Sequence, residues 1–285
     1  MDIVRTVLDE FINPHVKTVF GFLPPGINHC EPLSPKWRFI TGISWFFLGR
    51  STRAMVLGRN TKILYNPWRF GNRRLNNAIR ALKKGSATKK QKELIGDLVF
   101  TLLHEATHLY QPLLGDIPKR GYRIWHEGTA DVAAFILSSQ LADRLRDNRD
   151  HTSRFSSGLT LLQISSESLV ECLSLYTDKR AEDLSWALHA APVKIPHHPA
   201  QDFIPPNSWT KTHQKNKTAG WKQKHALLNN PRRWVWNRFL VWEYAVGSLM
   251  IAQKMKKENL SFNDIFRSIA DSEVLKTIMS HKQNV

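Results

Sequence analysis

The sequence predicts an α+β fold, in which a small N-terminal sheet precedes a mostly helical C-terminal half. Strand-like and turn-forming residues gather in 36–67, whereas the apolar residues of most other segments recur at helical spacing. The chain has 285 residues, of which 42% are hydrophobic and only two are cysteines. A chain of this length can bury a core without disulfide bonds or structural metal ions.

The first predicted element is an amphipathic helix within residues 1–22. The apolar run 39–49 has about half of the ~20 residues needed to span a bilayer, which favours a buried strand pair or core segment. Residues 61–67 read as a strand ended by an Asn-Pro turn. Helical spacing then predicts a helix over 72–84 that stops at Gly85.

Longer helices are predicted for the rest of the chain. In each of these segments the apolar residues recur at helical spacing. The segments are 87–111, 126–146, 155–190 (two or three helices), 233–257 and a last helix from Ser261. We divide the chain into residues 1–135, with the sheet and the motif-bearing helices, and residues 136–285, a helical part. A proline-rich basic segment at about 191–232 is predicted to be an irregular insertion in this second part.

Positive charge is concentrated in two blocks, within a net charge of +17. Residues 36–92 hold 15 basic and no acidic residues, and residues 194–240 hold nine basic residues and one acidic residue. Cations interleaved with tryptophan suit a nucleic-acid backbone, an anionic membrane surface or an acidic protein. An ordinary solvated surface is the plainer interpretation. No nucleic-acid recognition motif is present, so nucleic-acid binding would be nonspecific.

The clearest chemical signal is an HExxH motif, His104-Glu105-Ala106-Thr107-His108, inside the predicted helix 87–111. Two histidines four residues apart lie on one face of a helix, so both imidazoles can reach one metal ion. Glu105 projects toward the side of that site, where it can take a proton from a metal-activated water. Two unrelated histidines beside a solvated glutamate would give the same short pattern.

A second segment offers the third protein ligand that a zinc site with an open position requires. Glu127 opens the predicted helix 126–146, and Asp131 lies one turn further along the same face. A carboxylate at Asp131 can accept the free ring N–H of a zinc-bound histidine and fix its tautomer. His126 is a rival ligand, although helix geometry directs its side chain elsewhere.

This pattern resembles that of the gluzincin metallopeptidases: the HExxH motif is followed after 18 residues by Glu127, and then by Asp131. The 18-residue interval is typical of the aminopeptidase branch of that family. The resemblance implies a Zn²⁺ cofactor held by His104, His108 and Glu127, with the motif glutamate as general base and acid. It implies a single zincin-like catalytic unit, with a small sheet, an active-site helix and a helical lower half. In that sheet an edge strand lines the cleft, a place that residues 61–66 would take.

The aminopeptidase branch also uses a tyrosine, in a Tyr-x-x-Gly pattern, to stabilise the oxyanion. Tyr244-Ala245-Val246-Gly247 matches this pattern, and the resemblance implies that role for Tyr244. A core tyrosine on an apolar helix is an equally simple interpretation. His213 and His225 are alternatives for the same role.

The sequence lacks the Gly-x-Met-Glu-Asn motif with which aminopeptidases hold a substrate amine, which favours an endopeptidase. We therefore predict a zinc-dependent metallopeptidase acting on a protein or peptide. The alternative is a basic nucleic-acid- or membrane-binding protein whose metal site is structural or vestigial. The first residues carry no signal-peptide pattern, which predicts a cytoplasmic protein unless secretion uses no cleaved signal. No integral membrane segment is predicted.

Overall fold

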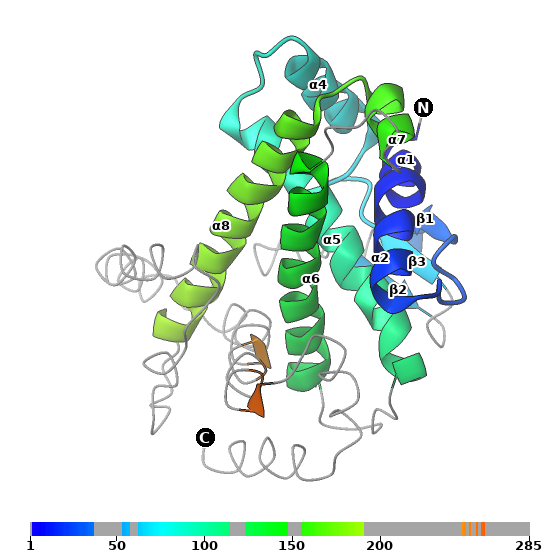
Figure 1. The fold of residues 1–285 in the computed structure, drawn as a ribbon, viewed down its shortest axis with the longest axis vertical. Coiled ribbons are helices and arrows are strands. Elements are labelled where there is room, and N and C mark those ends of the chain that lie inside the picture. The colour runs from blue at the N-terminus through cyan, green and yellow to red at the C-terminus, as the bar shows by residue number, and fades with distance from the viewer. Residues whose placement is uncertain are drawn as a thin grey trace. The chain divides into compact units, whose positions relative to one another are not determined.

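The computed structural model of the chain is shown in Figure 1. It describes residues 2–36, 53–57, 62–114, 123–147 and 155–190, and isolated positions between 247 and 259. The predicted segments at 39–49 and 191–232, the last helix from Ser261 and most of 233–257 lie outside the described residues.

The chain divides into two compact units. The first contains Met1–Ile43, Ser51–Tyr110 and Ala133–Thr177, and the second contains Ser44–Arg50, Gln111–Val132 and Asp178–Val285. The described residues are mostly helical with one small mixed sheet, which confirms the predicted α+β class. None of the described helices is both long and apolar enough to cross a membrane.

The N-terminal helix is continuous but changes its winding in the middle. It consists of α1 (Ile3–Val7), a π-helical turn η1 (Leu8–Ile12) and α2 (Asn13–Phe20). The Asp2 side chain caps its start by accepting from the backbone N–H groups of the first turn. Gly21, with a φ of 82°, ends it in the left-handed conformation that glycine adopts most easily. The amphipathic helix predicted for residues 1–22 is thereby confirmed.

His15 attaches this helix to α6 (Arg123–Arg146). Its Nε2 lies 2.9 Å from the carbonyl oxygen of Leu137, and the Arg144 guanidinium lies 3.3 Å from its Nδ1. Burial and the charge of Arg144 lower the pKa of His15 to about 4. The imidazole is therefore neutral at physiological pH, with Nε2–H donating to the carbonyl and Nδ1 accepting from the arginine.

Three short strands form the sheet: β1 (Cys30–Pro32), β2 (Ala54–Leu57) and β3 (Lys62–Tyr65). Their order is β1-β3-β2, with β3 parallel to β1 and antiparallel to β2. The expectation that 61–66 forms the edge strand is therefore wrong, because β3 is hydrogen-bonded on both sides. Its last three residues are all buried, as expected for a strand covered on both faces.

Helix α4 (Asn72–Lys83) follows the sheet as predicted, and Gly85, with a φ of 63°, turns the chain after it. The apolar residues of α4 are buried against the rest of unit 1. The next helix, α5 (Lys89–Leu114), contains Gly96, a residue type that weakens a helix interior. A Cβ at Gly96 would overlap the carbonyl oxygen of Cys172, so glycine permits close packing of α5 on a neighbouring helix.

That neighbour is α8 (Ser166–Ala190), which follows the short helix α7 (Ser156–Leu162). Phe100 of α5 contacts Phe135 of α6 at a ring-centroid distance of 4.9 Å and Tyr176 of α8 at 5.4 Å. Within unit 1, three helices therefore share one apolar core.

A buried ion-pair cluster ties β2 and the turn before α4 to α5. Asp97 of α5, only 2% exposed, pairs with Arg53 at 3.2 Å and with Arg69. Burial raises the pKa of Asp97, but the charges of the two arginines more than offset it, so the pKa lies below its ordinary value.

Candidate metal centre

The HExxH motif lies in the middle of α5, where the helix is buried on all sides. His104, Glu105 and His108 are 7%, 6% and 6% exposed. The apolar residues of the preceding turns pack into the core, which fixes the rotation of the helix and therefore the direction of the motif. The four-residue spacing places the two imidazoles one above the other, as predicted.

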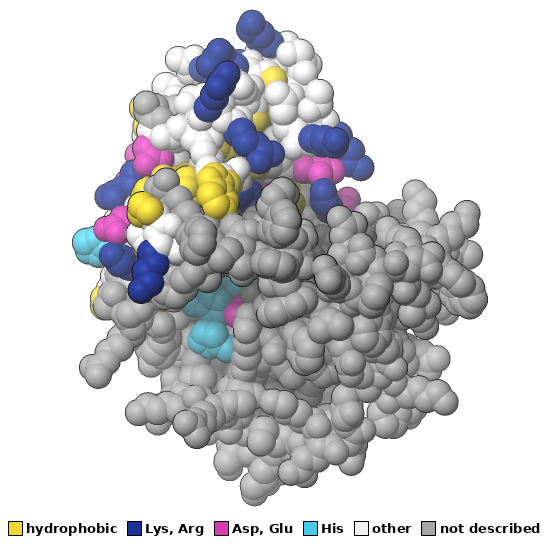
Figure 2. Space-filling model, turned by 180° about the vertical axis from the view of Figure 1, so that it is seen from behind, with side chains coloured by type: hydrophobic (Ala, Val, Ile, Leu, Met, Phe, Trp, Pro, Cys, Tyr) yellow, Lys and Arg dark blue, Asp and Glu magenta, His cyan; other side chains and the backbone are white. Residues whose placement is uncertain are grey.

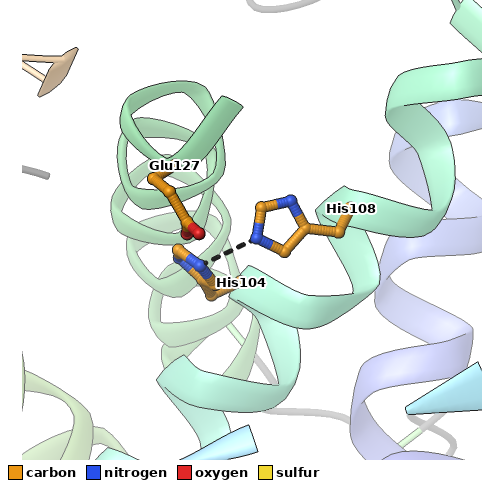
Figure 3. A group of neighbouring side chains, drawn as sticks. All are labelled: His104, His108 and Glu127. Atoms are coloured by element: carbon orange, nitrogen blue, oxygen red, sulfur yellow. Dashed lines mark hydrogen bonds between the residues drawn. The ribbon is translucent and has the colours of Figure 1, made fainter. Parts of the chain in front are cut away.

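The two histidines present the same nitrogen to each other. Their Nε2 atoms lie 3.1 Å apart (Figure 3). Two nitrogens bound to one tetrahedral zinc ion at about 2.0–2.1 Å would be separated by about 3.3 Å. The observed separation therefore fits ligation of a single ion by both rings.

Glu127, near the start of α6, completes the group. Its carboxylate points toward the two imidazoles in Figure 3, and the ligand atoms of His104, His108 and Glu127 lie within 4.8 Å of one another. Two imidazole nitrogens and one carboxylate oxygen form a donor set that zinc accepts readily. The three side chains that the sequence predicted as ligands are thus brought together and could hold a metal ion.

Glu105 is not a member of this group, but its negative charge acts on the Cys30 thiol of β1. Burial raises the pKa of the Cys30 thiol to about 12, and the negative charges of Asp2 and Glu105 add to that shift. A buried carboxylate beside a potential metal site can act as a general base.

Two contacts hold the start of α6 next to Glu127. Gln111, fully buried, donates from Nε2 to the backbone carbonyl of His126 at 2.8 Å. A Cβ at Gly128 would overlap the backbone of Gly247, so glycine allows another turn of helix to approach the residue after Glu127. Both contacts fix the backbone from which Glu127 extends.

Asp131 forms a buried ion pair. Arg180 of α8 donates to its carboxylate at 2.6 Å, and the two side chains are 1% and 5% exposed. The predicted hydrogen bond from a ligand histidine to Asp131 remains a prediction. The arginine neutralises a carboxylate that would otherwise be costly to bury beside Glu127.

Sequence reasoning missed Gln111 and Arg180. The sequence does hold one signal for Gln111, a polar residue one helical turn after His108 in an otherwise apolar stretch. No local pattern connects Arg180 to Asp131, which is 49 residues away.

The remaining site predictions are not decided by these contacts. His126 is half-buried and, among the described residues, does not belong to the group of three potential ligands. Tyr244, His213 and His225 lie outside the described residues.

Comparison of the chain with known proteins gave no match to any protein family, any curated protein or any solved structure.

Proposed function

We propose that this protein is a zinc-dependent metallopeptidase of the gluzincin type that hydrolyses internal peptide bonds. The observation that carries the proposal is the buried group of His104, His108 and Glu127. Structural zinc sites use four protein ligands and are often rich in cysteine, whereas hydrolytic sites use three and leave a position for water. Among the described residues this group has three members and no cysteine.

The chain's own residues would divide the work of hydrolysis. Bound zinc would supply a Lewis acid that polarises the scissile carbonyl and acidifies water. The two histidines and Glu127 would hold the ion, and the Arg180–Asp131 pair would stabilise the helix that carries Glu127. The Glu105 carboxylate would accept a proton from the attacking water and pass it to the leaving amine.

The first prediction concerns metal content. Full-length wild-type protein is expected to contain close to one zinc ion per chain, measured by elemental analysis, and Glu127→Ala to contain much less. Loss of one of three ligands leaves an open pair of histidines, which binds weakly. Glu167→Ala is the matched control, since this exposed glutamate of α8 lies outside the site. Wild-type protein that folds but takes up no zinc when zinc is added would contradict the proposal.

We also propose that Tyr244 donates a hydrogen bond to the oxyanion. Support comes from Gly247, the last residue of the Tyr-x-x-Gly pattern, whose backbone approaches Gly128 beside Glu127. Tyr244→Phe removes only the phenol oxygen and is expected to lower kcat by about a hundredfold, the effect of losing one oxyanion donor. Zinc content should not change. A variant with full activity would assign the role to another residue.

Inhibitor binding would distinguish the enzyme from a protein with a structural metal. In the enzyme, a fourth position stays open to water, so a small anion or hydroxamate binds the loaded protein and inhibits it. A closed, four-ligand site would bind neither.

A further inference from the structure

Two groups of basic residues within 36–92 differ in their contacts. In the first group, each cation forms an ion pair with a carboxylate of the same unit. Its described members are Arg53 and Arg69 on Asp97, Lys62 on Glu31, and Lys92 on Glu171. These four residues contribute little free positive charge to the surface.

The second group is exposed and has no carboxylate partner within the part of the chain that the structure describes. Its members are Arg73, Arg80, Lys84, Lys89 and Lys90, and we call them the basic stripe. Arg74 and Lys83 are exposed too, but they donate hydrogen bonds to the carbonyl oxygen of Trp68 and to Gln163 and are not counted in this group. Arg73, Arg80 and Lys84 follow each other at intervals of seven and four residues, which places them within about 20° of one line along α4. With a rise of about 1.5 Å per residue, the line from Arg73 to Lys84 is about 16 Å long.

The stripe continues past the Gly85 turn into the first residues of α5, where Lys89 and Lys90 lie. Figure 2 shows Lys and Arg side chains distributed over the end of unit 1 at which Figure 1 labels α4. Helix α4 itself contains no acidic residue, so the exposed cations along it create a positive potential that attracts a linear polyanion.

An exposed tryptophan lies at the start of the stripe. Trp68 is 54% exposed, and Arg74 in the first turn of α4 donates to its carbonyl oxygen at 3.3 Å. An exposed indole offers a flat apolar surface on which another ring can stack. Cations in a row with an aromatic ring beside them are the elements with which proteins bind single strands, through phosphates and base stacking.

The exposed face of α4 is less suited to a membrane or to a protein partner. The large apolar residues of α4, which are Leu75, Ile79 and Leu82, are all buried. A membrane-surface helix inserts its apolar face among the lipids, and α4 has none to offer. The centres of protein interfaces are depleted in lysine, which makes up three of the five stripe residues.

We propose that the basic stripe and Trp68 bind single-stranded nucleic acid without sequence recognition. The cations contact successive phosphates, and the indole of Trp68 stacks on a base. This site is separate from the metal ligands and does not depend on the proposed peptidase activity.

The test is fluorescence anisotropy of a labelled oligothymidine with the full-length protein. The variant Arg73→Gln/Arg80→Gln/Lys84→Gln is expected to bind about tenfold more weakly near physiological salt. The slope of log K against log salt should become less steep by about 2, one counterion effect for each lost phosphate contact. The matched control, Arg5→Gln/Lys17→Gln/Arg146→Gln, removes the same charge from other exposed positions of unit 1 and should bind within about twofold of wild type.

Trp68→Ala tests the stacking contact. It is expected to weaken binding of oligothymidine about fivefold or more and to leave binding of inorganic polyphosphate, which has no bases, unchanged. Equal weakening in the two triple variants would overturn the proposal, because net charge alone would then explain binding. An equal effect of Trp68→Ala on both probes would overturn it too. Tighter binding to phosphatidylserine vesicles than to oligothymidine would assign the surface to a membrane.

Discussion

Glu105→Gln is expected to abolish most hydrolysis while zinc remains bound. Glutamine has the size of glutamate but cannot accept the proton, and loss of a general base lowers kcat by a factor of about a hundred to ten thousand. The ligand group does not include Glu105, so the metal should stay. The measurements are cleavage of a fluorogenic peptide library by zinc-loaded protein and elemental analysis of the same samples.

Glu93→Gln is the control for this prediction, because it makes the same change on the same helix, twelve residues before the motif glutamate. Both measurements should stay at the wild-type level. If Glu105→Gln cleaved peptides normally, the proposed proton transfer would be wrong. If it lost zinc, Glu105 would have a role in holding the metal.

Asp97→Asn is expected to cause a large loss of stability although it keeps the size of the side chain. Asparagine lacks the charge that compensates Arg53 and Arg69. Breaking a buried pair of this kind costs several kcal/mol, and the partial exposure of both arginines reduces the cost to about 2–3 kcal/mol. Thermal unfolding followed by circular dichroism should show a midpoint lower by about 8 °C.

The comparison for Asp97 is Glu31→Gln, which breaks the pair with Lys62, where both side chains are about half exposed. Exposed pairs contribute at most about 1 kcal/mol, so the midpoint should move little. The pKa of Asp97 is lower in the folded protein than in the unfolded chain. Its contribution is therefore present above its ordinary pKa of 3.8 and is lost as the pH falls below that value. Equal midpoints for Asp97→Asn and wild type would show that the cluster is energetically neutral.

The candidate metal site was largely predictable because its geometry is local. The positions of His104 and His108 follow from one turn of a helix, whose apolar face is visible in the sequence. Glu127 was predictable because it opens a second periodic segment with a carboxylate one turn later. The contacts that hold these ligands in place are not local: Asp131 meets Arg180 of another helix, and such pairs leave no period in the sequence.

The sequence allowed the central strand of the sheet to be predicted, but not the order of the strands. The Lys62–Tyr65 strand has a clear apolar pattern, whereas Cys30–Pro32 has three residues and no pattern. Because the sequence gives no sign of the partner strand Cys30–Pro32, residues 61–66 were assigned to the edge of the sheet. Gly96 illustrates the opposite case, since a residue that weakens a helix locally is required by a contact with Cys172.

The N-terminal helix has a consequence for synthesis on the ribosome. His15 bonds Leu137, which is translated 122 residues later, and Glu10 accepts a hydrogen bond from Ser157, 147 residues later. At about 5–20 residues per second, His15 waits roughly 6 to 24 seconds for its partner to be translated. During that interval only its contacts with earlier parts of the chain, such as α4 and Tyr110 of α5, can form. Part of the apolar face of this helix therefore stays open to chaperones until α6 and α7 have been translated, and the core of unit 1 is complete only after the Tyr176 region of α8 has followed.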